Sequence, residues 1–314
     1  MAGFSKTSVH TVEQVTTGHY GRWSPIIRKT FAFLSCFAYD WGVPYLNEYL
    51  DQQLARGRAY FSRQEALDAL ALTPQNLAAA ISRLISKGRL ANPRHGFYLI
   101  LRPEDRTLGA PDPVRWIDPL MKHQRIDYRI SLLRAAAFHG STHQAAMVFQ
   151  IVVPKQLRGF EIGRHRLQFV YQAPHSFAKA NRPEYLVQMK SEAGFAKVAV
   201  VELTLLDCAR YLHRAAGING VAQIVKDLGG KADPRKLAKL ADVYENSSVR
   251  RLGYLLELGR HPRQAKALEP FAREAKSLKP LDPAAKPLVA SLATSPERNS
   301  KWMLLLNERV EVEA

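Results

Sequence analysis

The sequence predicts an α+β protein in which an N-terminal winged helix-turn-helix is followed by a larger mixed α/β C-terminal domain. Residues 62–101 follow the order helix, turn, helix and short β-ribbon, which is the outline of a winged helix. Prolines at positions 103, 111, 113 and 119 come next, and this density breaks regular structure. Beyond them, the apolar residues of some segments have the spacing of a helix and those of others have the pattern of a strand, which indicates a second, mixed domain.

The first helix of the predicted winged helix begins at a capping box. Ser62 and Glu65 have the S-x-x-E spacing in which the hydroxyl accepts from an orphan amide and the glutamate reaches back. Ala66, Leu67 and Leu70 then form an apolar stripe. A helix is therefore expected to begin after Ser62 and to bury this stripe.

The second helix is expected to begin at Thr73-Pro74 and to stop before Gly88. Thr73 is a good N-cap, and Pro74 falls at the first helical position, where its missing N–H has no cost. Gly88 suits the left-handed conformation that ends many helices. Apolar residues at helical spacing predict the buried face: Leu77, Ile81, Leu84 and Ile85.

The opposite face of this second helix is polar and small, and two interpretations apply to it. Any solvated helix shows a polar face, but small side chains also let a backbone approach DNA closely. Gln, Asn and Arg are the residue types that read base edges. The basic turn of the ribbon beside the helix favours DNA. The predicted DNA-binding residues are Thr73, Gln75, Asn76, Ser82, Arg83, Lys87, Arg94 and His95.

Composition is that of a basic globular chain. The 314 residues carry 45 Lys+Arg against 28 Asp+Glu, a net charge of +17, and 46% are hydrophobic. The positive excess is spread along the chain rather than gathered in a tail. Such a surface attracts polyanions, although an acidic protein partner would satisfy the charge equally well.

Cysteine usage and hydropathy indicate a cytoplasmic protein. Cys36 and Cys208 lie far apart in apolar segments, which favours two buried thiols over a disulfide and suits a reducing compartment. The apolar run at residues 31–39 is too short to span a bilayer. It also lacks the small-residue cleavage site of a signal peptide.

The pattern divides the chain into four expected parts. These are a partly helical N-terminal extension (1–43), the winged helix-turn-helix (44–102), a Pro-rich linker (103–119) and the C-terminal α+β domain (120–314). In the last two parts, helices are expected at 117–124, 128–139, 204–213, 219–227, from Asp233-Pro234, and at 249–258. Strands are expected at 150–154, 166–171 and 196–201. An exposed helix with turns is expected over 260–286, and a strand pair over 301–313 that closes the sheet.

Two groups of residues could suggest catalysis, and each also has a structural interpretation. His139 and His143 have a zinc-binding spacing, but Gly140 between them indicates that the helix ends there, which favours capping and hydrogen bonding. Acids and lysines typical of a metal-dependent nuclease also occur, yet the acids fit the start of a capped helix. This second group comprises Lys190, Lys197, Glu202 and Asp207.

No phosphate-cradling loop or nucleophile elbow occurs in the sequence, so no catalytic residue, metal ligand or cofactor is assigned. Further basic residues lie on predicted helices whose other faces are apolar. They form either a solvated face or a second polyanion-binding surface. These residues are Arg235, Lys236, Lys239, Arg250 and Arg251.

Four segments carry a family resemblance in the same order: residues 84–104, 118–144, 200–220 and 248–259. They resemble the AbiEi family of type IV toxin–antitoxin antitoxins, which are predicted transcriptional regulators of phage-defence (abortive infection) loci. The resemblance spans roughly residues 44 to 312. By position, several of the predicted DNA-binding residues fall in the family's DNA-reading element: Gln75, Asn76, Ser82, Arg83, Lys87 and Arg94.

The resemblance implies an N-terminal winged helix that binds inverted repeats in the operon's own promoter and represses it. It also implies a C-terminal domain that assists repression and neutralises a nucleotidyltransferase toxin, without a stable complex. One recognition helix per chain suggests two copies on an inverted repeat, which need not be dimeric in solution. Two alternatives stay open: an enzyme that acts on nucleic acid through its C-terminal domain, and a stand-alone regulator without a toxin.

Overall fold

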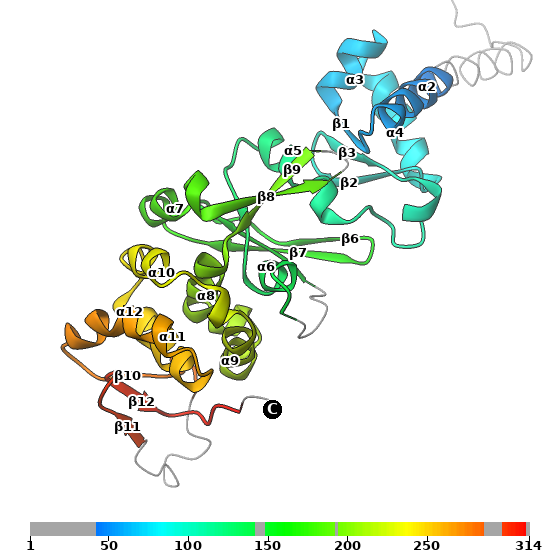
Figure 1. Ribbon diagram of the computed structural model, residues 1–314. Coiled ribbons are helices and arrows are strands. Elements are labelled where there is room, and N and C mark those ends of the chain that lie inside the picture. Colours follow the sequence, from blue (N-terminus) through cyan, green and yellow to red (C-terminus); the bar gives the residue numbers. More distant parts are fainter. Residues whose placement is uncertain (1–41, 142–147, 192–193, 286–296, 312–314) are drawn as a thin grey trace, which may run out of the picture.

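The computed structural model describes residues 42–141, 148–191, 194–285 and 297–311. Its mixed helices and strands confirm the predicted α+β class. Figure 1 shows an elongated molecule with a small helical unit at one end and a sheet in the middle. Helices and a small second sheet lie at the other end.

Within the described residues, the N-terminal unit contains three helices and a small antiparallel sheet of order β1-β3-β2. Both predicted helix starts are confirmed: the Ser62 hydroxyl accepts from the Glu65 amide while the Glu65 carboxylate accepts from the Ser62 amide. The Thr73 hydroxyl accepts from the amide of Asn76. The elements are α2 (Gly42–Ala55), β1 (Tyr60–Ser62), α3 (Arg63–Leu70), α4 (Pro74–Ser86), β2 (Leu90–Arg94) and β3 (Phe97–Ile100).

The buried face of α4 differs from the prediction at one position. Leu77, Ile81 and Leu84 are buried, but Ile85 is 40% exposed and Ala80 is buried in its place. Positions 77, 80, 81 and 84 follow the i, i+3, i+4, i+7 spacing of a single helix face, whereas position 85 lies further round the helix. The predicted apolar stripe therefore included one residue, Ile85, that does not lie on the buried face of the helix.

Within the described residues, six strands form the central sheet, in the order β6-β7-β5-β4-β9-β8. The β5–β7 and β4–β9 pairs are parallel, and the other pairs are antiparallel. The strands are β4 (Arg129–Ile130), β5 (Val148–Val153), β6 (Phe160–Ile162), β7 (His165–Tyr171), β8 (Leu186–Ser191) and β9 (Gly194–Ala199).

Both faces of this sheet are covered by helices, and the alternation along β5 shows how. Phe149, Ile151 and Val153 belong to one core cluster, which includes the buried side chains of α5. Val152 belongs to a second cluster, which includes those of α6 and α8. A strand buried on both faces reads as a continuous apolar run, which explains the clear sequence signal here. The helices are α5 (Ile117–His123), α6 (Leu132–Phe138) and α8 (Val201–Arg210).

The C-terminal half is mainly helical, and its largest core cluster extends from the sheet into these helices. Asp233 caps α10 as expected, since its carboxylate accepts from the amides of Arg235 and Lys236. The longer helices are α7 (Pro174–Ala180), α9 (Gly217–Leu228), α10 (Pro234–Ala241), α11 (Asn246–Leu258) and α12 (Pro262–Arg273). The 3-10 turns are η1 (Pro103–Asp105), η2 (Pro113–Arg115), η3 (Pro183–Tyr185), η4 (Leu212–Arg214) and η5 (Gly229–Lys231).

Two expected helices need correction. The helix expected at 128–139 begins as strand β4, because Ile130 pairs with Val198 and Ile151 inside the sheet. The helix within 260–286 is not simply exposed, since α12 buries Ala265 and Leu268. The edge strands β6 and β8 were not predicted at all.

The strand pair expected over 301–313 does not close the central sheet. β12 (Leu304–Leu306) pairs instead with β10 (Lys279–Pro280) and β11 (Glu297–Asn299) in a separate small sheet. The buried Trp302 ring occupies the space beside Gly253 on α11, where no larger residue fits. This contact holds the C-terminal segment against α11 and away from the central sheet.

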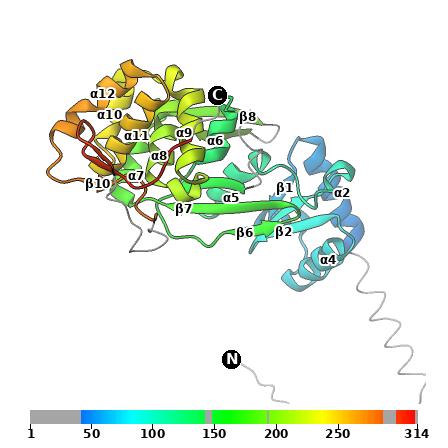
Figure 2. The same cartoon turned by 90° about the horizontal axis from the view of Figure 1, so that it is seen from below.

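The N-terminal unit and the central sheet share one core. Phe97 and Leu99 of the β2–β3 ribbon belong to the same apolar cluster as Trp116, Ile117 and Phe149. Figure 2 shows β6 and β7 extending toward β2, and β2 contacts β6. The ribbon is therefore packed between the two parts of the molecule.

Two of the features that led to the expectation of a cytoplasmic protein, hydropathy and the cysteines, can be compared with the structure. Across the described ranges, no helix combines the length and apolarity needed to cross a bilayer. Cys208 is a buried free thiol, as expected, and burial raises its pKa above the usual value. Cys36 lies outside the described residues.

Candidate nucleic-acid interface

Helix α4 presents most of the predicted DNA-binding residues on one accessible face. Gln75, Asn76, Ser82 and Lys87 are exposed, and Arg83 is half-buried. Helical spacing brings them together, because residues three and four apart are neighbours on a helix surface. The hydroxyl of Thr73 is committed to the N-cap of the same helix.

The sequence segment that contains this helix carries positively charged side chains and no negatively charged ones. From Ala69 to Pro103 the chain contains no acidic residue. Two arginines of this segment contact acidic residues outside it: Arg89 reaches Asp51 as well as Asn47 of α2, and Arg102 pairs with Glu104. The basic residues of this segment are Arg83, Lys87, Arg89, Arg94 and Arg102.

Arg94 does not lie where the prediction placed it. Its guanidinium donates to the carbonyl oxygen of Arg158 and lies over the ring of Phe160, 4.4 Å from the centroid. The Phe169 ring is 5.9 Å away. Burial lowers the pKa of Arg94 from its usual value. A guanidinium held in this way packs the ribbon onto the central sheet, so we withdraw its assignment to a DNA phosphate.

His95 stays exposed at the turn of the ribbon, but its backbone is also engaged. Its carbonyl oxygen lies 3.2 Å from Nε2 of His123, whose ring packs against Phe97. The turn therefore contacts α5 rather than standing free. His123 was not expected to have any role, and no local signal in the sequence indicates this contact.

The second basic surface predicted from the sequence is only partly at the surface. Arg235 and Lys239 of α10 are exposed, and Lys236 is half-buried. Arg250 and Arg251 of α11 are 3% and 4% exposed, so their assignment to that surface is wrong.

The two buried arginines have a structural reason for their position. Arg250 donates to the carbonyl of Met303 over 2.7 Å, and Arg251 donates to the carbonyl of Ala209 over 2.9 Å. Further bonds join them to the carbonyls of Ser277 and Leu281. Buried carbonyl groups need donors, and a guanidinium has five N–H groups, so these residues tie irregular segments to α11.

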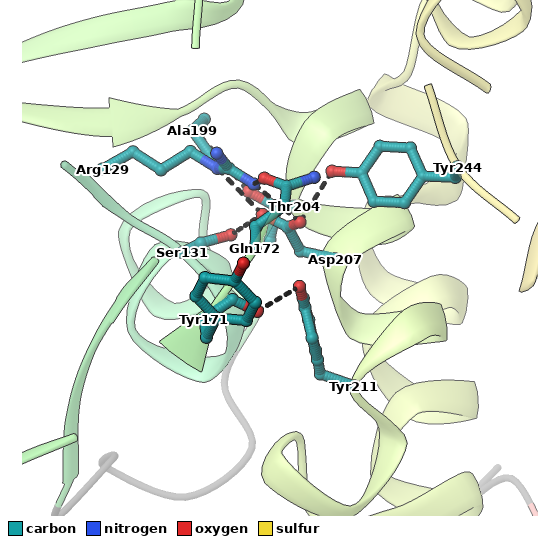
Figure 3. Close-up of polar contacts among 9 residues, drawn as sticks. All are labelled: Arg129, Ser131, Tyr171, Gln172, Ala199, Thr204, Asp207, Tyr211 and Tyr244. Atoms are coloured by element: carbon teal, nitrogen blue, oxygen red, sulfur yellow. Dashed lines mark hydrogen bonds and ion pairs between the residues drawn. The ribbon is translucent and has the colours of Figure 1, made fainter. Parts of the chain in front are cut away.

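A buried polar network lies between the central sheet and the helical half, as Figure 3 shows. Arg129 of β4 donates to both carboxylate oxygens of Asp207 on α8, over 3.0 and 2.9 Å. Ser131 and Tyr244 each donate to the same carboxylate over 2.6 Å. Arg129 and Asp207 are both fully buried. Burial opposes the charge on Arg129, but the facing carboxylate raises its pKa overall.

This network and its surroundings account for the residues considered for catalysis. All the acceptor atoms of Asp207 are engaged, while Glu202 accepts from the backbone amide of Asp233 over 2.8 Å. Lys197 pairs with Asp127 instead of facing these acids, and Lys190 is exposed on β8. In the part of the chain that the structure describes, no three His, Cys, Asp or Glu residues are grouped to hold a metal ion.

His139 has the structural role that was favoured for it. Its Nε2 lies 2.7 Å from the carbonyl oxygen of Ala199, so it links the end of α6 to the end of β9. His143, the other half of the proposed zinc pair, lies outside the described residues.

Comparison with known proteins agrees with the resemblance. The model of the AbiEi antitoxin C-terminal domain matches residues 129–258. A search of curated proteins gives no match. The crystal structure of the RV2827C protein from Mycobacterium tuberculosis has a similar fold, with a TM-score of 0.58 and 15% sequence identity. The similarity covers 83% of this chain and 91% of that one.

The matched region contains the whole Arg129–Asp207 network and ends with helix α11. Its fold is thus held together by residues that lie inside the match. Residues 129–258 therefore match the C-terminal domain of the AbiEi antitoxins, which supports an antitoxin assignment for this part of the chain.

Proposed function

We propose that the protein is the DNA-binding antitoxin and autorepressor of a type IV toxin–antitoxin operon, and that it antagonises a nucleotidyltransferase toxin in the cytoplasm. An antitoxin domain implies a toxin in general. The N-terminal unit supports DNA binding because α2, α3 and α4 followed by the β2–β3 ribbon have the order of a winged helix-turn-helix. The proposed parts are residues 44–102 for DNA and 120–314 for antitoxin action, joined by 103–119.

The observation that carries the DNA-binding proposal is the exposed, acid-free face of α4. In this proposal Gln75, Asn76 and Arg83 contact base edges in the major groove, and Ser82 allows close approach. Lys87 at the end of the helix contacts a phosphate. Because the ribbon is packed on the central sheet, it orients α4 relative to the larger domain instead of reaching DNA through Arg94.

Two copies are proposed to bind the inverted repeat, since each chain carries one such helix. Antagonism of the toxin is proposed to act without a stable complex. The exposed basic residues of α10, Arg235 and Lys239, belong to the larger domain and are available for its contribution to repression.

The test of DNA binding is a gel-shift titration of the full chain against its own operon's promoter at fixed salt. Arg83→Ala and Gln75→Ala should each weaken binding by about 1–3 kcal/mol, as expected for one lost base contact. Arg251→Ala is unsuitable as a control because Arg251 is buried, whereas Arg263→Ala removes an exposed charge on α12, at the opposite end of the molecule from α4 (Figure 1). Unchanged affinity of both α4 variants would refute the proposed site.

The test of antitoxin function is co-expression with the product of the adjacent gene. A neighbouring nucleotidyltransferase whose toxicity is relieved by this chain supports the proposal. Arg83→Ala should still relieve toxicity, since α4 is proposed to serve repression alone. A chain that binds its promoter but has no toxic neighbour is a stand-alone regulator, which would contradict the antitoxin part.

A further inference from the structure

A polar groove lies at the β6 edge of the central sheet, and none of its lining residues belongs to α4 or α10. Its main hollow has a volume of about 540 Å³ and is lined by Arg166 and Gln168 of β7 and by Arg214 of η4. An adjoining hollow of about 490 Å³ shares Arg214 and adds Arg158 and Tyr171. The connection between β5 and β6, residues 154–159, borders both.

The arginines of this groove differ from the buried arginines of the larger domain. Arg129, Arg250 and Arg251 have their guanidinium groups bonded in the interior. The side chains of Arg158 and Arg214 have no bonding partner among the described residues, and both are exposed. Guanidinium groups gathered around one hollow repel each other, so an anion placed between them gains from each.

Nearby acidic residues do not cancel the positive charge of these arginines. Arg166 faces Glu161 at 3.7 Å, and both side chains are more than half exposed, so solvent screens the pair strongly. Glu161 is also the only acidic residue between Lys155 and Arg166 in the sequence, against four basic ones. The groove therefore keeps a net positive charge.

The walls of the groove are held by backbone contacts that leave the two guanidinium groups free. The carbonyl of Arg158 accepts from Arg94, and the carbonyl of Arg214 accepts from the buried amide of Gln150 over 2.6 Å. A Cβ at Gly159 would lie 2.6 Å from the carbonyl oxygen of Leu167, so only glycine lets this connection approach β7 so closely. The site is thus preformed, which lowers the entropy lost on binding.

We propose that this groove binds a nucleoside phosphate, either as a free nucleotide or as one nucleotide of a single strand. Arginine is the side chain best suited to phosphate, because its planar donors match two phosphate oxygens. The ring of Tyr171 is 43% exposed and offers a face on which a base can stack. The side-chain amide nitrogen of Gln168 adds a donor, while its oxygen accepts from Gln150 over 3.1 Å.

The size of the hollows sets the ligand class. Volumes of about 500 Å³ fall in the range of small-molecule sites and suit one nucleotide. A duplex, in contrast, is bound on open surfaces and through its grooves. This groove is therefore distinct from the proposed operator-binding face, and its existence does not rest on the function proposed for α4.

The experiment measures binding of two probes to the full chain: a fluorescein-labelled eight-nucleotide single-stranded RNA by anisotropy and ATP by calorimetry. The variant is Arg158→Ala/Arg214→Ala, which removes two side chains that make no bonds among the described residues. The matched control is Arg263→Ala/Lys266→Ala, which removes the same charge from the exposed face of α12. The groove variant should weaken binding about tenfold or more, corresponding to about 1.4 kcal/mol or more, and the control less than about twofold.

The outcomes separate the source of the ligand and the validity of the site. ATP that binds and displaces the RNA identifies a free nucleotide as sufficient, while RNA binding that ATP does not displace identifies a strand. Equal weakening by the groove variant and the control would overturn the proposal, since it would indicate diffuse charge attraction. Absence of binding by both probes, or preferential binding of a duplex of the same length, would also overturn it. Gel shifts on the operator, which depend on α4, report separately on the proposed function.

Discussion

Helix α4 and the β2–β3 ribbon are neighbours in the sequence and carry similar basic residues, yet their surroundings are opposite. Lys87 and the polar face of α4 are exposed to solvent. Arg94 of the ribbon is held by Phe160 and by the carbonyl of Arg158. The same side-chain chemistry is therefore exposed to solvent in one element and used for packing in the other, and of the two only the ribbon packs against the central sheet.

The comparison extends to the larger domain. Arg129, Arg250 and Arg251 are buried and bonded, while Arg158 and Arg214 are exposed and unbonded within the described residues. The high net charge of the sequence consequently does not show which basic residues lie at the surface. Substitutions that remove interior arginines or their partners should change stability, and substitutions of exposed ones should change binding.

The largest effect is expected for Asp207→Ala. It leaves the charge of Arg129 buried without its partner and removes the acceptor for Ser131 and Tyr244. Breaking a buried pair in this way costs about 3–5 kcal/mol of unfolding free energy. Urea denaturation followed by circular dichroism measures it, with Glu161→Ala as a control that removes an exposed pair and should cost less than about 1 kcal/mol. A loss below 1 kcal/mol for Asp207→Ala would show that the network is not structural.

Arg94→Ala should have an intermediate effect on stability and none on the salt dependence of DNA binding. Loss of the contact with Phe160 and of the bond to Arg158 should cost about 1–2 kcal/mol of unfolding free energy. Because no phosphate contact is lost, the slope of log K against log salt should not change. A slope reduced by about one unit at unchanged stability would restore the role that the sequence predicted.

Lys87→Ala should show the reverse behaviour. The side chain is exposed, so unfolding free energy should change by less than about 0.5 kcal/mol. Operator binding, measured by gel shift at several salt concentrations, should lose about one unit of salt slope. If Lys87→Ala and Arg94→Ala gave the same pair of results, the contrast between helix and ribbon would be wrong.

The smallest effect is expected at the capping box of α3. Burial raises the pKa of Glu65, but hydrogen bonds from Arg58 and Ser62 outweigh this and lower it overall. A lowered pKa means that this contribution to stability is present above the usual glutamate pKa and is lost as the pH falls through the folded value. Glu65→Gln should cost about 0.5 kcal/mol at pH 7 and should flatten the acid side of the stability profile. An unchanged profile between pH 5 and 3 would argue against the cap.

Local signals were enough to predict much of the fold. The capping residues Ser62, Thr73 and Asp233 each start a helix where expected, because the bonds involved lie within three residues of chain. Strand β5 was evident because a strand buried on both faces is mostly apolar, and Gln150 is the one polar residue of β5. The AbiEi resemblance was also carried by the sequence, although the match to the family model is confined to residues 129–258.

Long-range pairing had no local signal. Arg129 and Asp207 are 78 positions apart, and nothing near either residue identifies the other. In the sequence, Asp207 fitted the start of a helix, whereas in the structure it is the buried partner of Arg129. The edge strands β6 and β8 were missed for a related reason, since an edge strand is short or partly solvated and its sequence shows a weak period.

The sequence by itself determined the helix starts, the apolar strands of the sheet, the excess of positive charge and the polar face of α4, because each depends on neighbours along the chain. Only the tertiary structure decided which arginines are exposed. Burial of a guanidinium depends on whether carbonyl or carboxylate groups from distant parts of the chain accept its hydrogen bonds. The carbonyl of Met303 accepts from Arg250, and the carboxylate of Asp207 accepts from Arg129. In the same fold, Arg158 and Arg214 have no bonding partner among the described residues and lie beside one groove, where their donors can meet a phosphate.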